Sequence, residues 1–131
     1  MTPINPASLG APRGYSNGML APAGGRLLFV AGQIGWDADQ RFVSPDFVPQ
    51  FERALENAVA VVQAAGGTAA DIGRLTLYVV SREEYTRDLA AVGAAYRRVM
   101  GRHFPAMALL EVKALLEPDA RVEIEATAVI P

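Results

Sequence analysis

Several residue types on which catalytic and cofactor sites commonly depend are absent or nearly absent from this chain. Its 131 residues include no cysteine and one histidine. Without cysteine there is no disulfide, no thiol nucleophile and no thiolate ligand for a metal, and the composition is compatible with a reducing compartment. The histidine has no metal-ligand partner nearby in sequence, and none of Ser16, Ser44 and Ser81 lies in a nucleophile-elbow motif. No phosphate loop is present either, so we expect no metal and no cofactor.

Long apolar runs and an excess of one charge are missing as well. No stretch approaches the roughly 20 apolar residues of a membrane span, and residues 1 to 18 have no apolar segment as long as that of a signal peptide. The formal net charge is -2, so no basic field is available to hold a phosphate backbone. The sequence therefore predicts a cytoplasmic protein that binds neither nucleic acid nor a membrane.

The composition is that of one folded domain. Hydrophobic residues make up 51% of the chain and charged residues 20%, unlike the polar composition of disordered proteins. Chains usually divide into domains only beyond about 250 residues. We expect a single domain over residues 1 to 131, of which residues 1 to 13 form an irregular segment because proline and glycine recur there.

Strands and helices are predicted from hydrophobic periodicity. Strands are expected at 14 to 21 and 26 to 34, joined as a hairpin by the turn APAGG, and later at 74 to 80, 106 to 116 and 120 to 129. The last two strands are joined by a turn at 117 to 119. One amphipathic helix is expected at 45 to 65, ending at Gly66, and a second from Ser81, which forms a capping box with Glu84, to Gly101.

The order of these elements leaves part of the predicted sheet uncovered. Two helices can cover one face of a five-stranded sheet but not both. The strands LLFVAG and MALLEV are apolar at both sets of alternating positions, so a monomer would expose a large apolar surface. This pattern predicts a homo-oligomer whose subunits meet through the helix-free face of the sheet.

Several motifs together resemble the RidA/YjgF family. GYSNG, FVAGQIGWD, ALENAVAVVQAAGGTAADI, FPA, LEV and VEIEATAV occur in the order and spacing of that family, over nearly all of the chain after about residue 14. The resemblance implies an α+β fold of the chorismate-mutase-like type, with five to six strands and two helices on one face. It also implies a homotrimer with ligand clefts between subunits.

The resemblance further implies an activity. Archetypal members of the family hydrolyse enamine/imine intermediates released by pyridoxal-phosphate enzymes, giving 2-oxo acids and ammonia without a metal or cofactor. Other members lack this activity, and some carry older labels as ribonucleases or translation inhibitors.

Site residues follow from the same resemblance, position by position. The family's N-terminal tyrosine matches Tyr15, and its cleft-lining strand matches Ala31, Gly32 and Gln33. Its aromatic residue at the start of the second helix matches Tyr85. The acid that positions the attacking water matches Glu123. Without the resemblance, Glu123 and Glu125 would be interpreted as solvated or interface acids on one strand face, and Tyr85 as a core residue.

The chain departs from the deaminases at the start of one strand. Where they have phenylalanine, proline, alanine and arginine, this chain has Phe104, Pro105, Ala106 and Met107. The arginine clamps the substrate carboxylate with a planar fork of donors, which a thioether cannot supply. A cleft lined by Met107 and Leu109 is therefore expected to prefer an uncharged or apolar group over the usual 2-imino acids.

Two hypotheses of function follow. The first is a hydrolase of the enamine/imine type with altered specificity, in which Glu123 activates water. The second is a non-catalytic protein that binds a small molecule or partner group in the inter-subunit cleft. The sequence leaves open whether Arg102, His103 or Lys113 replaces the missing arginine, although we interpret His103 as structural and Lys113 as about 20 Å from Met107 along the strand.

Overall fold

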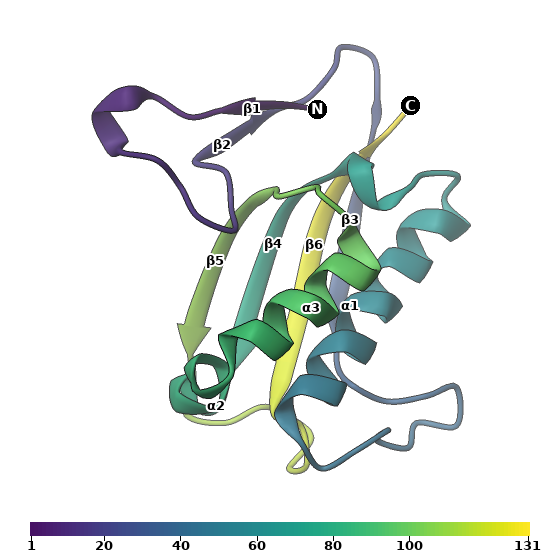
Figure 1. Cartoon of the computed structure of the whole chain (residues 1–131). Coiled ribbons are helices and arrows are strands. Elements are labelled where there is room, and N and C mark those ends of the chain that lie inside the picture. The colour runs from purple at the N-terminus through teal and green to yellow at the C-terminus, as the bar shows by residue number, and fades with distance from the viewer.

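Four strands form the main sheet of the chain, which a computed structural model describes from residue 1 to residue 131 (Figure 1). Their order across the sheet is β3 (Arg26–Gln33), β6 (Val122–Ile130), β4 (Ile72–Val79) and β5 (Ala106–Glu111). β6 runs antiparallel to both of its neighbours, whereas β4 and β5 are parallel. The α+β class predicted from the sequence is confirmed.

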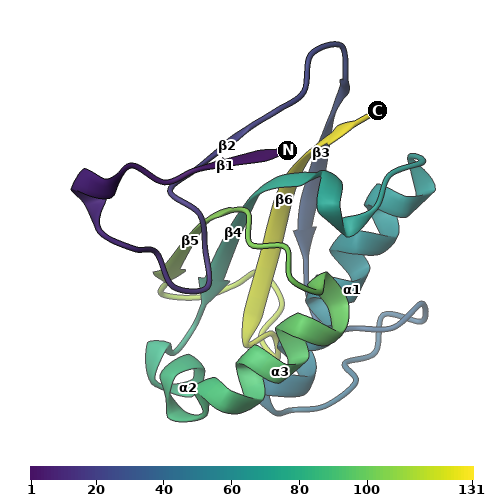
Figure 2. The ribbon, with the colours of Figure 1, turned by 45° about the horizontal axis from the view of Figure 1, so that its top comes forward.

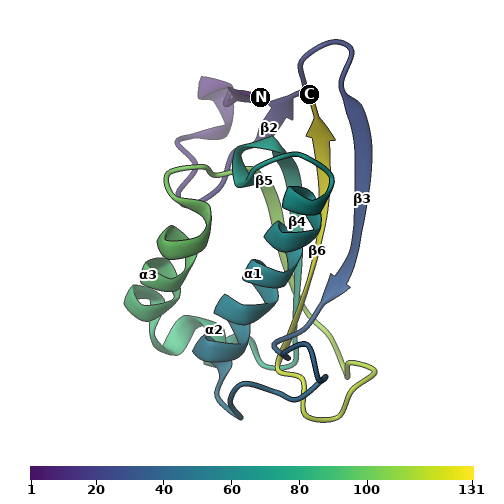
Figure 3. The same cartoon turned by 90° about the vertical axis from the view of Figure 1, so that its right-hand side faces the viewer.

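Both long helices cover the same face of this sheet (Figure 3). α1 (Phe47–Ala64) and α3 (Leu89–Met100) pack side by side, with the short α2 (Arg82–Arg87) between β4 and α3. No helix of the chain lies on the opposite face. The two-helix, one-face arrangement expected from the sequence is therefore present, and no helix is long and apolar enough to cross a membrane.

Alternating burial along β6, and along β4 from Leu75 to Val79, builds the core beneath the helices. The β6 side chains that point toward the helices are all less than 5% exposed, and they are Val122, Ile124, Ala126, Ala128 and Ile130. β4 contributes Ile72, Leu75, Leu77 and Val79 to the same layer. The intervening residues of both strands therefore point to the helix-free face.

The hairpin predicted around residues 21 to 25 does not form. β2 (Gly18–Leu20) pairs with β1 (Thr2–Ile4) in a separate two-stranded sheet, whereas β3 pairs only with β6. Figure 2 shows this N-terminal arm extending beyond the end of the main sheet. A turn motif indicates where the chain reverses locally, but the partner of each strand is decided by tertiary contacts.

The expectation of an irregular segment at residues 1 to 13 is also wrong in part. This segment contains β1 and a single turn of 3₁₀ helix, Ala7–Leu9. Pro3 lies within β1, opposite Met19. A proline is tolerated in a strand at a sheet edge, where its missing N–H costs no ladder hydrogen bond, so proline content alone did not exclude a strand.

The second predicted helix is interrupted. It begins after Ser81, whose hydroxyl accepts a hydrogen bond from the Glu84 N–H at 3.4 Å, and ends at Gly101 with φ 63°, both as predicted. Asp88 divides it, because the Asp88 carboxylate accepts a hydrogen bond from the Ala91 N–H at 3.0 Å and starts α3 anew. Aspartate competes with helical hydrogen bonding in this way, so one predicted helix is two.

The strand predicted at 106 to 116 ends earlier than expected. β5 stops at Glu111, and Lys113 lies in the following loop. The turn at 117 to 119 is present, with the Ala120 N–H donating to the Glu117 carbonyl at 3.1 Å. This loop does not form a hairpin, because β4 lies between β5 and β6 in the sheet.

One buried amide ties the loops at one end of the fold to α1. Gln50 is completely buried, and its Nε2 donates hydrogen bonds to the carbonyls of Ser44 and Asp119, each at 3.0 Å. Its Oε1 accepts a hydrogen bond from the Arg121 N–H at 2.7 Å. Gln50 thereby joins the segment before α1 to the segment before β6.

We predict that Gln50→Leu lowers the free energy of unfolding by about 3 kcal/mol, because three part-buried hydrogen bonds of about 1 kcal/mol each are lost. Urea unfolding followed by circular dichroism measures this loss. Gln63→Leu on the exposed side of the same helix is the matched control and should change stability by less than about 0.5 kcal/mol. Equal stabilities of the two variants would contradict the role assigned to Gln50.

Candidate functional site

Glu123 lies on the helix-free face of the sheet, against the backbone of Gly32. A Cβ atom at residue 32 would overlap the Glu123 carboxylate, so only glycine leaves room for that carboxylate. Glu123 is half-buried and takes part in none of the four ion pairs of the chain. Glu123 is therefore an acid without an ion-pair partner, and it lies next to exposed main-chain groups of β3.

The backbone next to Glu123 is irregular. The register between β3 and β6 shifts between Val30 and Gln33, which is the signature of a bulge spanning Ala31 and Gly32. Within it, Gln33 Nε2 donates a hydrogen bond to the Ala31 carbonyl at 3.0 Å. Because β3 is an edge strand, the outer main-chain groups of this segment have no strand partner within the chain. Such bulges commonly re-aim backbone groups beside ligand sites.

Tyr78 forms a hydrogen bond with one of the two neighbouring acids on β6 and not with the other. It lies opposite Glu123 in the register of β4 and β6, and its hydroxyl donates to Glu125 Oε1 at 2.8 Å. This hydrogen bond, helped by burial and by the negative charges of Glu125 and Glu123, raises the pKa of Tyr78. Glu125 therefore has a hydrogen-bond partner in Tyr78, whereas Glu123 does not. Tyr78 was not predicted as a site residue, although its alternation with Leu75 and Leu77 places it on the face of β4 opposite to theirs.

A second group of candidate residues lines a cavity of about 320 Å³ on the opposite, helix-covered face. Met107 and Tyr85 both lie in its wall. Burial raises the pKa of Tyr85, and burial together with the nearby Tyr85 raises that of Tyr96. Leu109 points to the same face as Met107 and packs against the core beside Leu77. The cavity side of Met107 is thus largely apolar, whereas the surface depression that it shares with Tyr15 also contains the exposed Arg74.

Tyr15 is positioned next to β5 by the residue that follows it. The Ser16 hydroxyl donates to the Phe104 carbonyl at 2.6 Å, and the Ser16 N–H donates to the Pro105 carbonyl at 3.1 Å. Tyr15 itself is 41% exposed. It shares a surface depression of about 310 Å³ with Met107.

The residues inferred as one site are therefore not united within a single chain. Glu123 and Gly32 lie on the helix-free face, whereas Met107 and Tyr85 lie on the helix-covered face. β3 and β5 moreover form the two opposite edges of the sheet. A ligand that contacts both groups would need a second copy of the chain.

None of the basic residues considered as replacements for the missing arginine lines the cavity beside Met107. The His103 imidazole donates from Nε2 to the Ile72 carbonyl at 2.6 Å, which agrees with the structural interpretation of this residue. Lys113 lies beyond β5, and Arg102 borders a different hollow. Arg97 of α3 does line the cavity, although it was not predicted as a site residue.

No group of three or more histidine, aspartate or glutamate side chains is arranged to hold a metal ion. The groups closest to Glu123 on the helix-free face are Tyr78 and the exposed main chain of Gly32, and Arg74 lies further along β4 on the same face. A half-exposed carboxylate of this kind can accept and return a proton.

Comparison with known proteins gives a consistent result. Residues 6 to 130 match the family model described as Endoribonuclease L-PSP. A RutC family protein of Haemophilus influenzae is 39% identical over 109 residues, covering 80% of both chains. A 2-iminobutanoate/2-iminopropanoate deaminase of Salmonella typhimurium is 37% identical over 108 residues, again covering 80% of both. The crystal structure of a Rid family protein from Yersinia pestis superimposes with a TM-score of 0.86 at 34% identity, covering 98% of each chain.

The buried tyrosine of the cavity predicts an alkaline loss of stability. Tyr96 donates its hydroxyl to the His103 carbonyl at 2.6 Å, and burial raises its pKa above the value of about 10 found in unfolded chains. The folded state therefore holds this proton more tightly, so the stabilisation is present below pH 10 and is lost as the pH rises above it. Urea midpoints between pH 8 and 11 should fall more steeply for the wild type than for Tyr96→Phe, and parallel curves would contradict this.

Proposed function

The chain belongs to the RidA/YjgF family, and we propose that it is an enamine/imine hydrolase of that family with altered specificity. The observation that carries the proposal is the Glu123 carboxylate, which is unpaired and lies against the main chain of Gly32. Relatives named as 2-iminobutanoate/2-iminopropanoate deaminases support the class of reaction.

The proposed chemistry needs one acid–base group. Glu123 accepts a proton from a water molecule while the water oxygen bonds to the electrophilic carbon of the imine. Glu123 returns this proton to the imine nitrogen, which gives a neutral amino alcohol. Glu123 then takes the hydroxyl proton of the amino alcohol and passes it to the amino nitrogen, so the carbonyl forms as the carbon–nitrogen bond breaks and ammonia leaves. Main-chain groups of Ala31, Gly32 and Gln33 orient the substrate nitrogen. Positioning and general acid–base catalysis together give a useful acceleration for so reactive a substrate.

The proposed site lies between subunits of a homotrimer. Its two groups of residues occupy opposite faces of one chain, so the helix-free face of one subunit must meet the β5 edge of the next for a ligand to contact both. Exposed apolar side chains on the helix-free face support such an interface, since Leu27 is 59% exposed and Phe29 74% exposed. In this arrangement Tyr15 and Tyr85 enclose the substrate.

Altered specificity is proposed from Met107. Its thioether offers no hydrogen-bond donor to a carboxylate, and its neighbours include Leu75 and Phe104. A small 2-imino acid would lose the solvation of its carboxylate there without compensation. The same apolar cavity favours the alternative, a binding protein that holds a small molecule without turnover.

We predict that Glu123→Gln abolishes ammonia release, because an amide of nearly the same size cannot accept the proton. Imines are generated in situ from amino acids with different side chains and from neutral amines, and ammonia is measured. Glu125→Gln is the matched control and should retain most activity, because its amide oxygen still accepts the hydrogen bond from Tyr78.

The oligomer mass of both variants is measured by sedimentation and should equal that of the wild type. Full activity of Glu123→Gln would refute the mechanism. A wild type that is inactive on every imine yet binds a ligand saturably would decide for the binding protein.

We further predict that Met107→Arg raises activity toward 2-imino acids, because a guanidinium fork restores both affinity and orientation for the carboxylate. The thermal midpoint and oligomer mass are measured beside ammonia release, since an unpaired guanidinium near Leu75 and Phe104 can destabilise the empty protein. A stable oligomer of this variant with no gain on any imino acid would show that the site differs from the deaminases by more than this residue.

A further inference from the structure

The cavity on the helix-covered face has the size of a small-molecule site. Its volume of about 320 Å³ is at the lower end of the roughly 300 to 1,000 Å³ range of ligand pockets. At about 30 Å³ for each atom, as in liquid water, it holds about ten non-hydrogen atoms. Its walls come from both long helices, α2 and the strands β4 and β5, and its apolar lining includes Phe51, Leu77, Tyr85, Val92 and Met107.

Arg97 is the charged residue of this wall, and no acidic side chain contributes to it. It follows Val92 and Gly93 on the face of α3 that borders the cavity. A Cβ atom at residue 93 would lie 3.3 Å from Arg97 Nη1, so the guanidinium folds back along the helix and rests over Gly93. The exposed Leu89 lies one turn further along the same border, where the cavity opens to solvent.

Gly93 lies inside α3, next to the guanidinium of Arg97. A glycine inside a helix is less stabilising than an alanine at the same position. Its φ lies outside the left-handed region, so the backbone of α3 does not require glycine there. The guanidinium of Arg97 lies close to this position, so an added Cβ would make a tight contact with it without excluding it.

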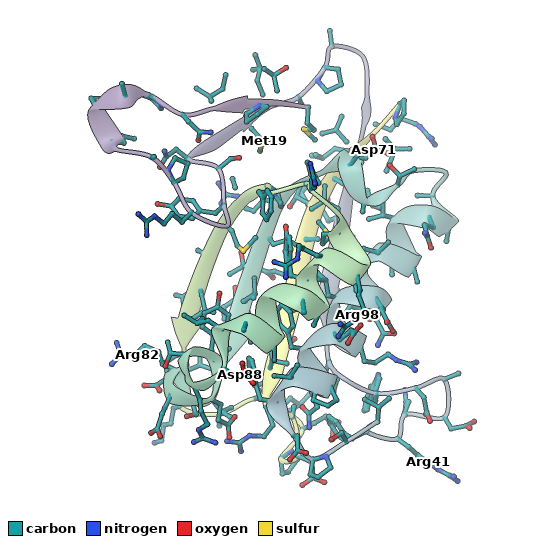
Figure 4. All side chains as sticks on the ribbon, in the orientation of Figure 1. Met19, Arg41, Asp71, Arg82, Asp88 and Arg98 are labelled. Atoms are coloured by element: carbon teal, nitrogen blue, oxygen red, sulfur yellow. The ribbon has the colours of Figure 1, made fainter.

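Arg97 differs from the neighbouring Arg98 because it has no acidic partner. Arg98, labelled in Figure 4, forms a fork with both carboxylate oxygens of Glu52, at 2.7 and 2.8 Å, and so joins α3 to α1. Arg97 takes part in none of the four ion pairs. A cation without an acidic partner, at the opening of an apolar cavity, is complementary to a ligand with one anionic end and an apolar body.

We propose that this cavity binds a monocarboxylate with an apolar body, of about ten non-hydrogen atoms in all. Arg97 holds the carboxylate at the opening, and the body lies between Tyr85, Met107 and Phe51. The arginine on α3 thus supplies, from the helix side, the anion contact that Met107 does not make. This rests on and deepens the proposed function, because it names the ligand class of a cavity that contains Met107 and Tyr85.

Isothermal titration calorimetry with octanoate and 3-phenylpropanoate tests the proposal, with octanamide as the uncharged match for octanoate. The acids should bind saturably, and octanamide at least tenfold more weakly, since a hydrogen bond to a charged group contributes a factor of about 10 to 100. Arg97→Gln should lower octanoate affinity at least tenfold and leave octanamide within twofold. Arg82→Gln, at an exposed arginine of α2 labelled in Figure 4, is the matched control and should bind as the wild type does.

Gly93→Ala provides a second variant that improves the helix. Its Cβ would lie 3.3 Å from Arg97 Nη1, a contact that the flexible guanidinium relieves by moving a few tenths of an ångström, so octanoate affinity should stay within about twofold of the wild type while the thermal midpoint stays the same or rises. Absence of saturable binding of either acid to the wild type, or equal octanoate affinity of the wild type and Arg97→Gln, would refute the proposal.

Binding and turnover are measured separately. Ammonia release that persists without carboxylate binding would refute this inference alone. Carboxylate binding without ammonia release from any imine would refute only the hydrolase.

Discussion

The helices cover one face of the sheet, and this single constraint determines where stability and chemistry lie. β6 runs through the middle, and its alternate side chains, from Val122 to Ile130, are buried beneath the helices. The residues between them, including Glu123 and Glu125, necessarily point the other way. Because the strand period is two, a slip of one residue would bury both acids and expose the core, so the packing that stabilises the fold also holds the acids in place.

Two acids two residues apart on one strand acquire different roles from their neighbours. Glu125 accepts the Tyr78 hydroxyl, which limits its freedom and its availability as a base. Glu123 lies over Gly32, where the absence of a side chain provides space without providing a partner. The difference comes from residues on β3 and β4, and not from the local sequence around the acids.

Local features of the fold could be predicted from the sequence, whereas pairings between distant segments could not. The apolar period of α1 and the stop at Gly101 depend on neighbouring residues, and both were predicted correctly. The partner of β2 depends on β1 across a loop, which no turn motif specifies. The apolar stripe of the second helix continues through Asp88, so periodicity concealed the break. Arg97 was overlooked as a site residue because only tertiary packing brings it to the cavity.

The division of the candidate residues between two faces links the proposed activity to assembly. A monomer can hold a ligand at Met107 or present an acid at Glu123, but not both to one substrate. The position of the positively charged side chain also affects how stable the protein is without its ligand. A guanidinium at residue 107 would be half-buried among apolar side chains and costly without its ligand, whereas Arg97 is exposed and stays hydrated when the cavity is empty. In the proposed site, a positive charge on the helix surface therefore makes the empty site less costly than one on the sheet would, and it favours ligands long enough to reach α3.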